Sequence, residues 1–217
     1  MYNIVLICTR HTELGKCNTN ELYHIIDEIQ PEVIFEELPL LIFNQCYNEN
    51  MHDMLLEQNA IKKYIKKRQI QHIPIDTLEI PNSYYENCEN KLKQIFKKNG
   101  EYLILLKKIS SSVGQLGFTF LNSKQHYALF EKIYILEETI INELNNKNLK
   151  DLFQLRNKTD NERENVMINN VYDYSKNSEY NKALMFTGAW HRKSFITKIN
   201  EYNERNNFKI DWKLDYF

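Results

Sequence analysis

Residues 2–17 read YNIVLICTRHTELGKC, and this stretch decides the fold. Its first part, Tyr2–Cys8, is a nearly continuous apolar run rich in Ile, Val and Leu, which is typical of a buried parallel strand. The run ends in a polar turn that contains His11. Polar residues at 18–20 then offer N-caps for a helix to about Ile29, whose apolar residues recur at helical spacing.

A second strand follows this helix and completes a β–α–β unit. Pro31 stops the helix, and Glu32–Leu38 (EVIFEEL) is another short apolar run. Such units are right-handed, and their two strands lie parallel in one sheet. The first forty residues therefore predict an α/β fold with helices flanking a central sheet.

The rest of the chain fits the same fold class. From Tyr84 to about Asn146 the pattern is mainly helical, with breaks expected at Gly100 and within 110–117, which indicates a helical insertion rather than a separate domain. The other expected elements are a helix from Leu40 to about Lys67 with a break near Asn48, a strand over Gln69–Ile75, a helix over 161–176, a strand over Lys182–Thr187, a helix over Arg192–Tyr202 and an edge strand over Phe208–Leu214.

The bulk composition is that of an ordinary globular protein. Hydrophobic residues make up 42% and charged residues 26%, while 5 Gly and 4 Pro leave little material for long linkers. The net charge of −1 gives no electrostatic case for a nucleic-acid partner. No apolar run approaches a membrane span, no signal peptide precedes the first strand, and the four cysteines form no CxxC pair. We therefore expect one cytoplasmic domain, residues 1–217, with no membrane span.

Polar side chains follow the predicted strands at the edge where parallel sheets bind ligands. His11, Glu36, Glu37, Asp76 and His191 all stand at predicted strand ends. Two imidazoles and one or two carboxylates suit a divalent metal, and they also suit general acid–base chemistry without a metal. This edge is therefore the predicted functional site.

Each of these residues also has an ordinary structural interpretation. A lone His at a strand end is commonly a hydrogen-bonded turn residue. Gly188 can serve a tight turn, and Asp76 can cap a helix that begins at 77–79. Because side chains alternate along a strand, Glu36 and Glu37 point to opposite faces, so at most one of them is expected in the site.

Four short motifs follow one another along the chain. They are CTRH at 8–11, the Glu-Leu pair at Glu37 that ends EVIFEEL, ERENVM at 162–167 and GAWH at 188–191. In this order the chain resembles the Tiki/TraB superfamily, which includes PrgY-like, erythromycin-esterase-like and ChaN-like proteins. That group carries two GxxH-type motifs at strand ends, with a Glu and a helical Arg between them. In this chain Cys8 stands where the first motif has Gly.

The resemblance spans nearly the whole chain and implies a mixed, partly parallel sheet with a shared polar cleft. Within the superfamily, Tiki-like members are described as metal-dependent proteases, and erythromycin-esterase-like members use the His as a base. ChaN-like members bind haem, and PrgY-like members act on or sequester peptides. The fold therefore transfers to this chain more safely than any one reaction.

We predict a metal-dependent hydrolase, of a protease-, peptidase- or esterase-like kind. In this hypothesis His11, Glu37 and His191 hold a divalent ion (Mn, Co or Zn) or activate water. Arg163 stabilises developing oxyanion charge or holds a substrate carboxylate. Three further residues are candidates for supporting roles, such as orienting His11: Glu13, Glu36 and Asp76.

The alternative is a non-catalytic protein of the same fold that binds a ligand, a peptide or haem, or that regulates another protein. The replacement of Gly by Cys8 favours this alternative. In both hypotheses the expected partner is a peptide or a small molecule. A third interpretation is a structural domain in which the four motif matches arise by chance.

Overall fold

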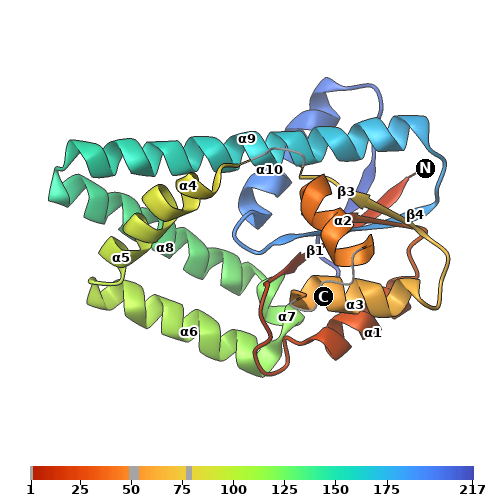
Figure 1. The fold of residues 1–217 in the computed structure, drawn as a ribbon, viewed down its shortest axis with the longest axis horizontal. Helices are drawn as coiled ribbons and strands as arrows, with labels where there is room; N and C mark the ends of the chain where they lie inside the picture. The colour runs from red at the N-terminus through yellow and green to blue at the C-terminus, as the bar shows by residue number, and fades with distance from the viewer. Residues whose placement is uncertain (1, 49–53, 77–79) are drawn as a thin grey trace.

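The computed structural model describes residues 2–48, 54–76 and 80–217 (Figure 1). Within these ranges five strands form one sheet in the order β3-β2-β4-β1-β5. All four strand pairings are parallel, so the sheet is parallel where the resemblance implied a mixed one. The strands are β1 (Asn3–Thr9), β2 (Val33–Glu36), β3 (Gln71–Pro74), β4 (Lys182–Gly188) and β5 (Asp211–Lys213).

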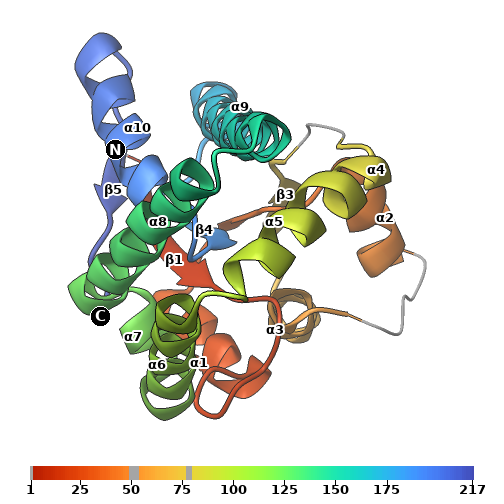
Figure 2. The same ribbon diagram turned by 90° about the vertical axis from the view of Figure 1, so that its left-hand side faces the viewer.

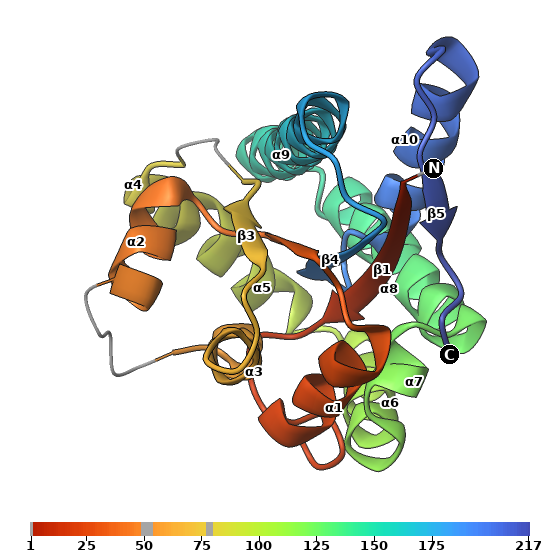
Figure 3. The ribbon, with the colours of Figure 1, turned by 90° about the vertical axis from the view of Figure 1, so that its right-hand side faces the viewer.

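Helices cover both faces of this sheet, which confirms the predicted α/β fold. Figure 3 shows α1 (Thr19–Ile29) and α3 (Leu56–Ile65) on one side, and α9 (Lys147–Asn177) and α10 (Arg192–Arg205) on the other. The predicted strands at residues 2–8, 33–37 and 183–187 are neighbours, as their shared apolar character indicated.

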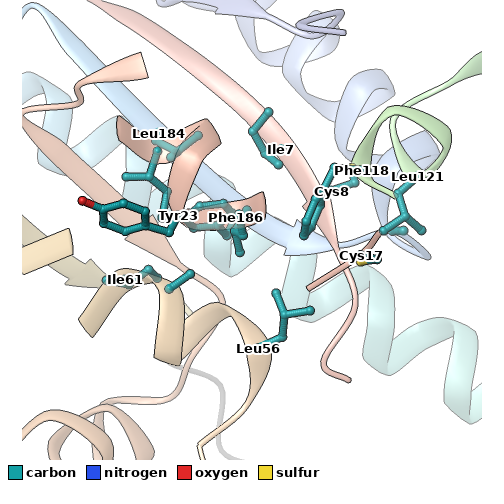
Figure 4. Close-up of a cluster of buried hydrophobic side chains, with 14 of the residues drawn as sticks. Ile7, Cys8, Cys17, Tyr23, Leu56, Ile61, Phe118, Leu121, Leu184 and Phe186 are labelled. Atoms are coloured by element: carbon teal, nitrogen blue, oxygen red, sulfur yellow. The ribbon is translucent and has the colours of Figure 1, made fainter. Parts of the chain in front are cut away.

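The apolar runs arise because these strands are buried on both faces. In β1, Val5 and Ile7 contact the layer that contains α1 and α3, whereas Ile4 and Leu6 contact the layer that contains α9 and α10. Figure 4 shows part of the first cluster, in which Ile7 lies among side chains from the sheet and the helices. The apolar pattern of the sequence therefore positions the sheet between two cores.

The middle of the chain forms a helical arm beside the sheet, which we define as α4, η1, α5, α6, α8 and the first half of α9 (Figures 1 and 2). The described residues between 80 and 146 contain no strand. The segments are α4 (Asn82–Tyr84), the π-helical turn η1 (Tyr85–Glu89), α5 (Asn90–Phe96), α6 (Gly100–Leu116), α7 (Phe118–Leu121) and α8 (Lys124–Leu144).

The predicted helix breaks are present, and one helix begins earlier than predicted. The breaks predicted at Gly100 and within 110–117 are present, since α5 ends at Phe96 and α6 begins at Gly100, and Gly117, with a positive φ of 60°, ends α6. The helix predicted at 161–176 begins at Lys147, because 147–177 contains neither Gly nor Pro. The helix expected from Leu40 to about Lys67, with a break near Asn48, is two helices, α2 (Leu40–Asn48) and α3, and 49–53 lie outside the described residues.

All four cysteines lie buried, as expected for small apolar groups. Of the helices in the described ranges, none combines the length and the apolar character that crossing a membrane requires.

Asn122 completes the edge of β1 beyond the short edge strand. β5 pairs only with Asn3–Val5, so the backbone of β1 needs another partner further along. The side-chain oxygen of Asn122 accepts a hydrogen bond from the Cys8 N–H at 2.8 Å, and its amide nitrogen donates to the Cys8 carbonyl at 3.0 Å. Cys8 is an ordinary strand residue without a positive φ, and its side chain lies in the core (Figure 4).

Replacing Asn122 with Ala should lower the free energy of unfolding by about 2 kcal/mol, because buried backbone groups of Cys8 lose their partners. Urea denaturation followed by circular dichroism measures the change. The control is Asn200→Ala at an exposed site on α10, which should change stability by less than ~0.5 kcal/mol. Equal effects of the two substitutions would show that Asn122 has no special role.

Candidate active site

The candidate site lies at the carboxyl edge of the sheet, where neighbouring strands lead to helices on opposite faces. β1 and β4 are adjacent, but β1 leads to α1 in one helical layer and β4 leads to α10 in the other. Ligand crevices open at such positions in parallel sheets. Four predicted residues stand at this edge, each just after a strand: His11 after β1, Glu37 after β2, Asp76 after β3 and His191 after β4.

Glu37 is the centre of this arrangement. Its Oε2 accepts hydrogen bonds from Thr187 Oγ1 at 2.9 Å and from the Gly188 backbone N–H at 2.7 Å. Its Oε1 accepts a hydrogen bond from Arg163 Nη2 at 3.0 Å and lies 3.6 Å from His191 Nε2. Burial raises the pKa of Glu37, but the charges of His191 and Arg163 and the hydrogen bonds outweigh it and lower the pKa. Glu37 is therefore a fixed carboxylate.

Arg163 of α9 joins two strand-end carboxylates. Its Nε and Nη2 donate to Oδ2 of Asp76 at 3.0 and 2.7 Å, and Nη2 also donates to Glu37. Only 15% of the Arg163 side chain and 3% of the Asp76 side chain are exposed. Asp76 is therefore an ion-pair partner of Arg163. The other interpretation of Asp76 was a cap for a helix that begins at 77–79, and these residues lie outside the described ones.

His191 lies between two carboxylates. Its Nδ1 is 2.8 Å from Oε1 of Glu164, which also accepts a hydrogen bond from Ser194. Burial lowers the pKa of His191, but Glu37, the hydrogen bond with Glu164 and the charge of Asp160 outweigh it and raise the pKa to about 9. The ring is therefore an imidazolium at neutral pH, and its Nδ1–H donates to Glu164.

His11 has a different carboxylate partner from the one predicted. Its Nδ1 lies 3.5 Å from Oε1 of Glu57 on α3, and the side chain of His11 is 59% exposed whereas that of Glu57 is 7% exposed. The nearby carboxylate of Glu57 raises the pKa of His11, against the effect of burial. Glu13, the predicted orienting residue, is exposed and accepts a hydrogen bond from the Thr19 N–H at the start of α1.

Glu36 has partners different from those of Glu37, although both residues line one pocket at this edge of the sheet. It is buried and accepts a hydrogen bond from the Tyr47 hydroxyl at 2.9 Å, and Nε2 of His72 lies 2.9 Å from the same oxygen. Burial is the main cause that raises the pKa of Glu36. The contacts with Arg163 and His191 therefore belong to Glu37.

A small pocket lies at this edge between His11 and Glu37. Its volume is about 20 Å³, which is room for one water-sized group. Three carboxylates line the pocket, those of Glu36, Glu37 and Glu57. Its apolar lining includes Leu38, Leu55 and Phe186.

The predicted metal ligands do not form a metal centre in this arrangement. In the described ranges, no three side chains of His, Cys, Asp or Glu are grouped so that they could hold an ion. Glu37 already binds the guanidinium of Arg163, whose positive charge opposes a divalent cation beside it. The raised pKa of His191 also opposes metal binding, because a metal ligand must be a neutral imidazole and the ion would have to displace the proton. The donor set therefore does not fit a divalent ion here.

Comparison with known proteins assigns neither a family nor a function to this chain. The chain matches no protein-family model, no curated protein and no solved structure. The resemblance to the Tiki/TraB superfamily therefore stays a prediction from the four motifs.

Two acidic residues of the site were missed by the sequence analysis. Glu164 directly follows Arg163 inside the motif ERENVM, so its place beside a predicted site residue was a usable signal. Glu57 carries no local signal, because it lies within the helix α3 and meets His11 only through the packing of that helix.

Proposed function

We propose that this chain is a hydrolase that activates water by general acid–base chemistry at the edge formed by His11, Glu37 and His191. One observation supports this proposal above the others: a half-exposed imidazole stands before a buried carboxylate, and both line a water-sized pocket. An imidazole oriented by a carboxylate is a common general base in hydrolysis.

His11 is the base in this proposal. Among the described residues, the ion-pair partner of its ring is the carboxylate of Glu57, which lies near Nδ1. The neutral ring then has Nε2 available to take a proton from a water molecule at the exposed side of the ring, and to return this proton to the leaving group. The carboxylate of Glu57 favours the tautomer that carries the proton on Nδ1, and it stabilises the imidazolium that forms.

Arg163 and His191 supply positive charge on the other side of Glu37, although Glu37, Asp76 and Glu164 offset part of it. Both side chains are mostly buried, at 15% and 13% exposed, so water screens their charges weakly. Positive groups held in such a place stabilise an acyl oxygen that becomes negative in the transition state. The arrangement therefore favours attack of water on a carbonyl group of a peptide, an ester or an amide.

Replacing His11 with Gln should lower kcat/KM by roughly 100-fold or more, since a positioned general base contributes about 10²–10⁴ to the rate. The measurement is turnover of a panel of peptide, ester and amide substrates by the whole protein, with melting temperature as the test of folding. The control is His24→Gln, because His24 is exposed on α1. A His11→Gln variant that turns substrate over at the parent rate would contradict the proposal.

The same assay separates the proposal from its alternatives. We expect turnover to survive treatment with a chelator, because the proposed base and cations are side chains. A metal-dependent hydrolase would lose turnover and regain it with Mn, Co or Zn. If the whole panel is inert and a peptide or haem still binds, the non-catalytic hypothesis is the better one.

A further inference from the structure

Glu57 is a buried carboxylate that lacks hydrogen bonds. Only 7% of its side chain is exposed, and within the described part of the chain neither of its oxygens has a hydrogen-bond partner. Its ion-pair partner among the described residues is His11, whose Nδ1 lies 3.5 Å from Oε1. Burial of a charged carboxylate costs several kcal/mol unless hydrogen bonds and an opposite charge compensate it. Glu57 therefore has an unused capacity to bind a donor.

The other carboxylates of the pocket wall already have partners. Glu36 accepts from Tyr47 and contacts His72, while Glu37 is bound by Arg163 and by backbone and hydroxyl donors of β4. No Lys or Arg lines the pocket among the described residues. Glu57 is therefore the carboxylate of the pocket that lacks a compensating partner, and a positive group in the pocket would bind there.

We propose that this pocket is a subsite for a primary ammonium group, which the carboxylate of Glu57 binds. The volume of about 20 Å³ suits a single nitrogen with its hydrogens, whereas a planar guanidinium is too large. A divalent ion needs more ligands, and no three metal-binding side chains are grouped in the described ranges. Oε1 lies 3.5 Å from His11, so in this proposal Oε2 binds the ammonium.

The substrate class follows if the proposed hydrolysis is correct. An ammonium held at Glu57 places the adjoining carbonyl next to His11, which contacts the other oxygen of the same carboxylate. The substrate would then be a peptide with an unblocked amino terminus, or an ester or amide of an amino acid. This step rests on the proposed function, whereas the binding of an ammonium group does not.

The binding test uses propylamine as the probe, since it carries the ammonium and contains no bond to hydrolyse. Calorimetry with the whole protein should show saturable binding of propylamine, and 1-propanol of nearly the same shape should bind at least 10-fold more weakly. Glu57→Gln should weaken propylamine binding at least 10-fold, while Glu204→Gln at an exposed site on α10 should leave it unchanged. The comparison of propylamine with 1-propanol uses the parent protein, so it does not depend on whether a variant folds.

Three results would overturn the subsite: equal binding of propylamine and 1-propanol, no saturable binding of propylamine, or unchanged binding in Glu57→Gln. Stoichiometric binding of Mn²⁺ that is lost in Glu57→Gln would also overturn it, in favour of a metal site. If propylamine binds and no substrate is hydrolysed, the proposed function fails while the subsite stands. If amino-acid esters with blocked and unblocked amines are hydrolysed equally and propylamine does not bind, the subsite fails while the function stands.

Discussion

Replacing Arg163 with Met should lower the free energy of unfolding by about 3–5 kcal/mol, the usual cost of removing one partner from a buried ion pair. The guanidinium holds the carboxylates of Glu37 and Asp76, of which only 9% and 3% are exposed. Met preserves most of the aliphatic volume of Arg. The decrease in the free energy of unfolding therefore comes chiefly from the two buried carboxylates that no longer have this cation beside them. Urea denaturation at neutral pH measures the change.

Two further variants test this explanation. Arg68→Met removes an exposed ion pair with Asp27 at 3.7 Å, and we expect its effect to stay within about 1 kcal/mol. Adding Glu37→Gln and Asp76→Asn to Arg163→Met should recover much of the lost stability, because the buried charges disappear together. Equal effects of the Arg163 and Arg68 substitutions would show that the Arg163 pairs contribute no more than surface pairs.

The sheet was predictable from the sequence because burial on both faces leaves a short-range signal. The apolar runs Tyr2–Cys8 and Lys182–Thr187 correspond to two central strands, and the alternating run at Phe208–Leu214 contains the edge strand. The direction of each strand depends instead on the connections between strands. Every connection here passes through helices, and all pairings are parallel, so the mixed sheet implied by the resemblance is not formed.

The candidate site was predictable only where a residue stands at a strand end. This rule led to His11, Glu37, Asp76 and His191, which the structure places at one edge of the sheet. The rule says nothing of helices, whose side chains reach the edge through packing. Arg163 was therefore found from a family motif, and Glu57 was not found.

Burial also changes what we expect of His191. A strand-end residue that faces a cleft would contribute little to stability, but only 13% of the His191 side chain is exposed, and its ring lies between Glu37 and Glu164. The charge of this ring is therefore part of the folding free energy. That contribution depends on pH, because the ring loses its proton within an accessible range.

Raising the pH from about 6.5 to about 9 should remove on the order of 3 kcal/mol of stability through His191. In the unfolded chain this His has its ordinary pKa near 6.5, and in the folded protein Glu37 and Glu164 raise the pKa to about 9. The folded state therefore binds the proton more tightly. The stabilisation is complete below pH 6.5, and it is lost as the pH rises through the folded pKa.

The variant His191→Gln isolates this contribution, since Gln stays uncharged across the same range. Urea denaturation of both proteins should show the parent's advantage over His191→Gln shrinking as the pH rises, because the parent loses its buried imidazolium. The variant His24→Gln should follow the parent at every pH, since His24 is exposed. A parent-to-variant difference that stays constant between these pH values would mean that the ring is uncharged in the folded protein. In that case His191 would be a neutral base or ligand beside Glu37. His191 would then take the role of the base in the proposed hydrolysis, and His11 would supply the positive charge.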